Sequence, residues 1–124
     1  MAELRVEMLV PVVPVADLDR SVQFYGKLGF ALAWIHQVDA GAPRLGSVRH
    51  GVVELFLTEH LVAPPGAVVY ANVVGIDVLA ETAQAAGLVA EYGPLNQPWG
   101  LRELGFRDPD GNLMRFGEPM GAAT

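Results

Sequence analysis

The sequence predicts an α+β fold built from two βαβββ modules, and three observations lead to this prediction. A strand, a capping residue, a helix, a glycine and three further strands follow one another twice, about sixty positions apart. A proline- and glycine-rich stretch at residues 63–66 is the best linker signal, and it lies between the two copies. A chain of 124 residues, 52% of them hydrophobic, can bury a core as one domain. We therefore expect a single domain over residues 1–124, with modules at about 5–62 and 67–118.

The first module is expected to open with a strand over residues 5–13, which Pro11 and Pro14 mark as a sheet edge or an arm. Asp17 has the side chain of a helix cap, and Gly29 supplies the left-handed residue at which a helix ends. Apolar side chains recur at helical spacing between them: Leu18, Val22, Phe24, Tyr25 and Leu28. Three strands are expected to follow, over residues 30–37, 45–50 and 52–58.

The second module repeats this order. A strand is expected over residues 67–76, and Asp77 and Gly87 should frame a helix. The apolar residues of that helix are Val78, Leu79, Ala83 and Ala86. Three strands are expected over residues 89–93, 101–107 and 112–117. Each sheet then has a helix on one face only, so the opposite faces of the two curved sheets should enclose a ligand cleft.

A tight turn is predicted between the last two strands. In the sequence Asp108-Pro109-Asp110-Gly111, proline takes the second position and glycine the fourth, as type I turns prefer. Trp99, which stands between Pro98 and Gly100, is not explained by this hairpin. Its context favours the edge of a loop over the core.

Composition excludes several classes of function. A net charge of −6, with Lys27 as the only lysine, argues against a nucleic-acid partner. No apolar run approaches the roughly 20 residues of a membrane span, and the start lacks the basic region of a signal peptide. We therefore expect a cytoplasmic protein without a membrane role. The chain has no cysteine, which excludes disulfides and thiolate chemistry.

Two long stretches carry a resemblance to a known family. The opening "PVVPVADLDRSVQFYGKLGF" and the closing "WGLRELGFRDPDGNLMRF" resemble the vicinal oxygen chelate superfamily of glyoxalases, extradiol dioxygenases and bleomycin resistance proteins. The Gln-Pro-Trp-Gly sequence and the strand pair "SVRHGVVELFLT" are most similar to the bleomycin-binding resistance proteins. The resemblance implies the glyoxalase/bleomycin-resistance fold.

Enzymes of this superfamily hold a divalent metal, and the resemblance places the four ligand positions at Val10, Glu54, about Ala71 and Arg115. Only Glu54 could bind a cation, and Arg115 would place a positive charge at the metal position. We therefore expect no metal, no cofactor and no catalytic residue. Both side chains should point into the cleft by strand alternation, so an ion pair between Glu54 and Arg115 is predicted instead.

The resemblance also implies a set of ligand-binding residues. Trp99 matches the tryptophan that stacks on the drug in the bleomycin-binding proteins, and Tyr70 matches a second cleft aromatic. The full set of candidates is Trp99, Tyr70, Phe56, Glu54, Thr58, Trp34, Gly100, Glu103 and Arg115. The three aromatic candidates Phe56, Tyr70 and Trp99 could instead be core residues. Glu103 and Asp39 could attract a cationic ligand or simply be solvated.

The sequence thus predicts a metal-free protein that sequesters an aromatic, cationic natural product of the bleomycin type. Pro11 matches the position at which the N-terminal arm of relatives crosses to a partner, so a homodimer with exchanged arms is expected. The alternative is a lyase, isomerase or dioxygenase of the same superfamily, including a metal-free enzyme with Glu54 as general base. A third possibility is an assembly partner without a small ligand.

Overall fold

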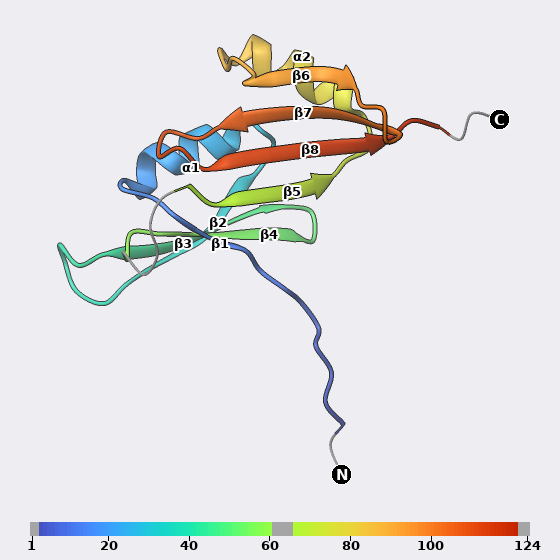
Figure 1. Ribbon diagram of the computed structural model, residues 1–124. Helices are drawn as coiled ribbons and strands as arrows, with labels where there is room; N and C mark the ends of the chain where they lie inside the picture. Colours follow the sequence, from blue (N-terminus) through green and yellow to red (C-terminus); the bar gives the residue numbers. More distant parts are fainter. Residues whose placement is uncertain (1–2, 61–65, 122–124) are drawn as a thin grey trace.

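The computed structural model of the protein describes residues 3–60 and 66–121. It contains two four-stranded mixed sheets, with strand orders β1-β4-β3-β2 and β5-β8-β7-β6 (Figure 1). The strands of the first sheet are β1 (Val12–Pro14), β2 (Ala31–Gln37), β3 (Arg44–His50) and β4 (Val53–Thr58). Those of the second are β5 (Val68–Asn72), β6 (Tyr92–Asn96), β7 (Leu101–Arg107) and β8 (Leu113–Pro119). In each sheet the first strand pairs in parallel with the last one, and the other pairs are antiparallel. The predicted α+β fold of two βαβββ units is confirmed.

Helix α1 (Leu18–Gly26) packs against β2, β3 and β4, and it is framed as the sequence predicts. The side chain of Asp17 accepts hydrogen bonds from the backbone N–H groups of Asp19 and Arg20, at 3.0 and 3.3 Å. Gly29 has the left-handed conformation that ends a helix, with φ of 94°. A second carboxylate also serves this helix, because Glu59, just after β4, accepts a bond from the Leu18 N–H at 2.7 Å.

Helix α2 (Ile76–Ala85) packs against β6, β7 and β8, but the prediction that Asp77 caps it is wrong. Its cap position is Gly75, which has no side chain that could accept a hydrogen bond from the helix. The carboxylate of Glu118, on β8, accepts bonds from the N–H groups of Gly75 and Ile76 at 2.9 and 3.0 Å. Asp77 lies in the first turn and forms an ion pair with Arg102. In both modules, therefore, a glutamate from the end of the sheet satisfies the start of the helix.

The strands of the second module differ in extent from the predicted ranges. The strand expected at residues 67–76 is β5, which is shorter than predicted and ends at Asn72. The strand expected at residues 89–93 begins only at Tyr92 and runs to Asn96, and Val89 is 89% exposed. The apolar Val89 is therefore a loop residue, and β-propensity alone misplaced the strand. Residues 61–65, with most of the predicted linker, lie outside the described residues, so the module limits remain predictions.

The hydrophobic core lies on the helix-bearing faces of both sheets. It includes the alternate residues Leu55 and Leu57 of β4 and Met114 and Phe116 of β8. Tyr25 of α1 is also fully buried there. In the described part of the chain, no helix has the length and hydrophobicity needed to span a membrane.

The Asp108–Asn112 turn joins the two modules through a buried polar cluster. Its predicted turn geometry is confirmed, because the Gly111 N–H donates to the Asp108 carbonyl at 3.1 Å. The Tyr25 hydroxyl of α1 donates to the Asp108 carboxylate at 2.7 Å. The Asn112 side-chain amide donates to the carbonyl of Pro14 at 2.8 Å and accepts from the N–H groups of Gly66 and Ala67. One hairpin therefore binds the first strand, the first helix and the segment that leads into the second sheet.

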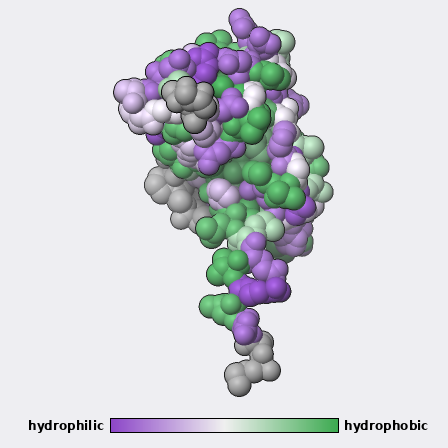
Figure 2. All heavy atoms as spheres, turned by 90° about the vertical axis from the view of Figure 1, so that its right-hand side faces the viewer, coloured by the Kyte–Doolittle hydropathy of each residue, from purple (hydrophilic) through white to green (hydrophobic). Residues whose placement is uncertain are grey.

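The N-terminal segment does not form the strand expected at residues 5–13. Regular pairing begins at Val12, although the Phe56 N–H already donates to the Pro11 carbonyl. Residues 3–10 extend away from the rest of the chain as an arm (Figure 1). Hydrophobic and hydrophilic side chains follow one another along it (Figure 2), and the hydrophobic Leu4, Val6 and Leu9 are exposed.

The polar cluster at the turn should contribute strongly to stability. We predict that Asn112→Ala lowers the free energy of unfolding by about 2 to 4 kcal/mol, because it leaves several buried polar groups without partners. Denaturation in urea measures this, with Asn96→Ala as control, since Asn96 is exposed and bonds only Arg102 among the described residues. Equal effects of the two substitutions would contradict the role of the turn.

Candidate functional site

The candidate site lies on the face of the second sheet opposite its core, called the open face below. Leu104, Phe106, Met114 and Phe116 point into the core, so Glu103 of β7 and Arg115 of β8 point to the other side. Tyr70 of β5 is paired in register with Arg115 and shares this face. Both helices lie behind this sheet in Figure 1, so neither covers the open face. Three predicted ligand-binding residues are therefore neighbours.

Two strand glycines on the open face hold tyrosine rings close to the sheet. A Cβ atom at Gly117 would overlap the hydroxyl end of Tyr70, and one at Gly105 would overlap the ring of Tyr92. Glycine in a strand often marks such a close approach. The Tyr70 ring also lies 5.5 Å from the guanidinium carbon of Arg115, which is a cation–π arrangement. The rings are thus fixed before any ligand arrives.

Glu103 is the centre of a hydrogen-bond network on this face. Only 1% of it is exposed, and its carboxylate accepts from Tyr70 at 2.8 Å and from Gln97 and Arg115 at 3.2 Å each. Burial alone would raise the pKa of Glu103. The bond from Tyr70, the nearby Trp99 side chain and the charge of Arg115 outweigh burial and lower that pKa. Glu103 is therefore an ionised carboxylate that accepts three hydrogen bonds.

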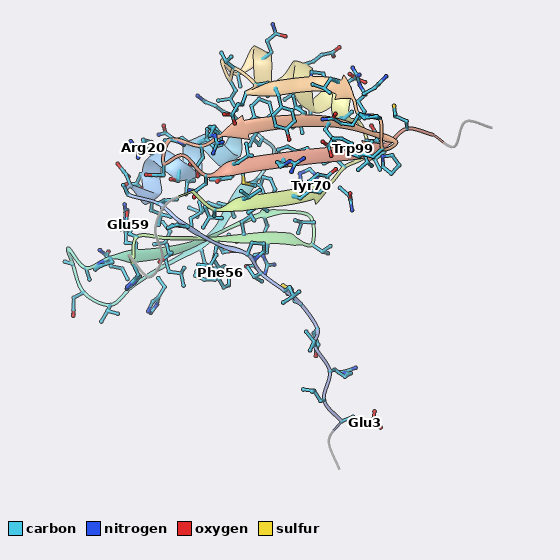
Figure 3. All side chains as sticks on the ribbon, in the orientation of Figure 1. Glu3, Arg20, Phe56, Glu59, Tyr70 and Trp99 are labelled. Atoms are coloured by element: carbon cyan, nitrogen blue, oxygen red, sulfur yellow. The ribbon has the colours of Figure 1, made fainter. Side chains whose placement is uncertain are left out.

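Trp99 lies in the turn between β6 and β7, at the edge of the open face. The residue is 60% exposed, which excludes the core alternative for Trp99. The next residue, Gly100, has φ of 88° and allows the turn. Figure 3 shows Trp99 and Tyr70 on the side of the sheet that faces the viewer, toward the same end. An exposed indole next to a fixed phenol ring is a suitable platform for a flat ligand.

A second cluster of predicted residues lies on the first sheet. Trp34 of β2 packs edge-on against Phe56 of β4, with ring centres 5.3 Å apart. Glu54 accepts hydrogen bonds from Ser47 and, at 3.3 Å, from Arg49. The Ser47 bond lowers the pKa of Glu54, with a smaller contribution from Arg49, and together they outweigh burial. Thr58 is buried, and its hydroxyl accepts from the His60 N–H.

The predicted ion pair between Glu54 and Arg115 is wrong. Glu54 forms an ion pair with Arg49 on its own sheet, and Arg115 forms one with Glu103 at 3.2 Å. Each charge finds its partner on a neighbouring strand of the same module. Strand alternation predicted correctly on which face of its sheet each side chain lies. It could not show that each residue forms its ion pair within its own sheet.

The residues at the superfamily metal positions do not fit a metal ion. Ala71 packs against the core, Val10 has no donor atom, and Arg115 is cationic. Within residues 3–60 and 66–121, no group of three His, Asp or Glu side chains could hold a metal ion.

Two hollows in the described chain are lined by other residues. One, of about 350 Å³, lies between α2 and β6. The other, of about 580 Å³, lies where the modules meet, and its lining includes Phe30, His50, Val53 and Phe116. Neither is lined by a predicted ligand-binding residue. These residues lie instead on open sheet faces.

Sequence reasoning missed two members of the network on the open face. Gln97 donates to Glu103, and the Tyr92 hydroxyl accepts from Arg115 at 2.9 Å. Gln97 opens the Gln-Pro-Trp-Gly sequence, so its proximity to Trp99 was a usable signal. Tyr92 lies inside the strand predicted at residues 89–93, but the sequence does not show that its hydroxyl reaches Arg115 on β8.

The chain matches a protein-family profile described as "Glyoxalase superfamily protein" over residues 1–122. No curated protein sequence matches it.

Solved structures share the fold over nearly the whole chain. TnmS3, an antibiotic-binding protein from Streptomyces sp. CB03234, is 29% identical with a TM-score of 0.73, over 96% of this chain and 98% of that one. A glyoxalase-related enzyme from Clostridium phytofermentans is 25% identical with a TM-score of 0.80, over 94% and 97%. A bleomycin-binding protein in complex with bleomycin is 22% identical with a TM-score of 0.68, over 91% and 98%.

The close approach of Tyr70 to Gly117 gives a test of the open face. We predict that Gly117→Ala lowers the free energy of unfolding by about 1 to 3 kcal/mol, because the added methyl group displaces the Tyr70 ring. In the double variant with Tyr70→Ala, the methyl group has no ring to displace. A double-mutant cycle by urea denaturation should give a coupling of at least about 1 kcal/mol. Additive effects would show that the ring does not lie on the glycine.

Proposed function

The chain belongs to the glyoxalase superfamily, and on this premise we propose that it is a binding protein that sequesters a flat aromatic natural product without converting it. The ligand stacks on Trp99 and Tyr70 at the open face. The observation that carries the proposal is the 60% exposure of Trp99 beside a preorganised hydrogen-bond network. Large aromatic side chains left exposed at a fixed site commonly mark a binding surface.

The comparisons support a binding role. Two of the similar structures are an antibiotic-binding protein and a bleomycin-binding protein. Stacking on one aromatic side chain adds about 0.5 to 1.5 kcal/mol beyond the area it buries, so a few such contacts give micromolar affinity. The natural ligand would then be an antibiotic or a related product, and binding would protect the cell.

The alternative is that the protein is an enzyme, and its similarity to a glyoxalase-related enzyme supports this alternative. The chemistry of this chain favours it less. A superfamily lyase, isomerase or dioxygenase needs metal ligands where this chain has Val10, Ala71 and Arg115. Glu54 is a poor general base at neutral pH, because the Ser47 bond and Arg49 lower its pKa.

We further propose that the cleft is completed by a second copy of the chain. In the described residues of one chain, the two aromatic clusters, Trp34–Phe56 and Tyr70–Trp99, lie on faces that neither helix covers. The arm carries exposed apolar side chains and projects away from its own chain (Figure 2). An exchanged arm would bury these side chains and bring the open face of one chain against the other.

Ligand binding is tested by titration calorimetry against a panel of flat aromatic antibiotics that includes bleomycin. We expect Trp99→Ala to weaken binding by at least about tenfold and Trp99→Phe to retain most of the affinity, because phenylalanine still stacks. Val89→Ala, at another exposed apolar position, is the matched control. No heat of binding with any member, or equal affinity of the Trp99→Ala variant, would contradict the proposal.

The oligomeric state is tested by light scattering at micromolar concentration. The full chain should have twice the mass of 13.2 kDa, and deletion of residues 1–10 should shift it toward the monomer. A full chain that is monomeric would rule out the shared cleft.

A further inference from the structure

We propose that the open face selects an aromatic ligand that carries an acceptor oxygen, such as a carboxylate, phenolate or quinone carbonyl, and that Arg115 binds this oxygen. This inference rests on the proposed binding function and makes its ligand more specific. It replaces the expectation of a cationic ligand drawn from Glu103 and from the charge of the whole chain.

Glu103 is poorly placed to bind a cationic ligand, because it is buried and already accepts three hydrogen bonds. One carboxylate oxygen accepts from the Tyr70 hydroxyl, and the other accepts from both Gln97 and Arg115. With 1% of the residue exposed, a ligand ammonium group could reach it only by displacing these donors. A buried carboxylate that loses its partners is costly, so this exchange is unfavourable.

Arg115 has the opposite character. A guanidinium group has five N–H donors in a planar fork. Its Nε–H donates to the Tyr92 hydroxyl, and one Nη2 N–H donates to Glu103. No acceptor among the described residues bonds Nη1, and the side chain is 35% exposed. Arg115 therefore presents remaining donors and a positive charge to whatever lies on the open face.

Glu54 and Glu91 are also paired with arginine. Glu91 forms an ion pair with Arg107 at 2.8 Å, and Glu54 forms one with Arg49 at 3.3 Å. The net charge of −6 therefore does not by itself place an unpaired carboxylate at these faces.

The geometry suits a ligand with a ring and an acceptor at its edge. The ring would stack at Trp99 and Tyr70, and the acceptor would meet the Arg115 guanidinium, which already lies over the Tyr70 ring. Hydrogen bonds between an ionised donor and an oxygen acceptor are among the stronger ones, and a carboxylate can accept two from one guanidinium. Glu103 positions this arginine and does not itself contact the ligand.

The test uses three ligands with one ring system: 2-naphthoate, 2-methylnaphthalene and 2-(aminomethyl)naphthalene. Binding to the wild-type protein is followed by NMR through the indole N–H signal of Trp99, identified with the Trp99→Phe variant. We expect 2-naphthoate to bind most tightly and the amine least tightly. Arg115→Gln should weaken 2-naphthoate by about tenfold and change 2-methylnaphthalene by less than about twofold.

Two further variants complete the design. Glu103→Gln keeps an acceptor for Tyr70 but leaves Arg115 without its counter-charge, so 2-naphthoate should bind several-fold more tightly. Arg102→Gln is the matched control, because this arginine lies on β7, next to the strand of Arg115, points to the other side of the sheet and pairs with Asp77. It should leave all three affinities unchanged.

The outcomes separate the two proposals. Tighter binding of the amine than of 2-naphthoate by the wild-type protein would overturn this inference and leave the binding function intact. An unchanged preference in folded Arg115→Gln protein would also overturn it. If none of the three ligands shifts the Trp99 signal, both this inference and the proposed function fail. The order of affinities of the wild-type protein for the three ligands tests this inference even if a variant does not fold.

Discussion

The structure depends on one buried polar contact, in which the Asp108–Asn112 turn of the second module holds the first. Asp108 and Asn112 are buried, and their side chains contact Tyr25 of α1 and the backbone of β1. Burial, followed by the Asp108 charge and hydrogen bond, raises the pKa of Tyr25 far above its usual value, so it remains a neutral donor. The same hairpin consists of β7 and β8, which carry Glu103 and Arg115. The contact that joins the modules therefore also fixes the strands of the site.

Glutamate carboxylates have two uses in this fold. Glu59 and Glu118 satisfy the starts of the two helices, and bonds from Arg44 and from the Leu18 backbone outweigh burial and lower the pKa of Glu59 to about 2. Glu103 has no helix to serve and instead orients Tyr70, Gln97 and Arg115. A buried ion pair contributes little net stability, so we interpret its retention on an open face as a feature of binding. The fold of the superfamily is kept, and the position that the resemblance assigns to a metal ligand is occupied by Arg115.

The sequence predicted what depends on neighbouring residues and missed what depends on distant ones. Asp17, Gly29 and the Asp108–Gly111 turn were correct because caps and turns are decided by local backbone bonds. The cap of α2 was missed because it comes from Glu118, far along the chain. The Glu54–Arg115 pair was wrong because each residue finds a partner within its own sheet, and alternation shows only which face a side chain takes. Trp99 was placed correctly in a loop because prolines and glycines surround it.

The central claim is that the open face of the second sheet binds a flat aromatic ligand without converting it. A crystal structure with the tightest ligand from the antibiotic panel tests it most directly. The account predicts an intact ligand whose ring stacks on Trp99 with an oxygen toward Arg115. A ligand bound in the hollow beside Phe30 and Val53 instead, or one recovered as a reaction product, would contradict it.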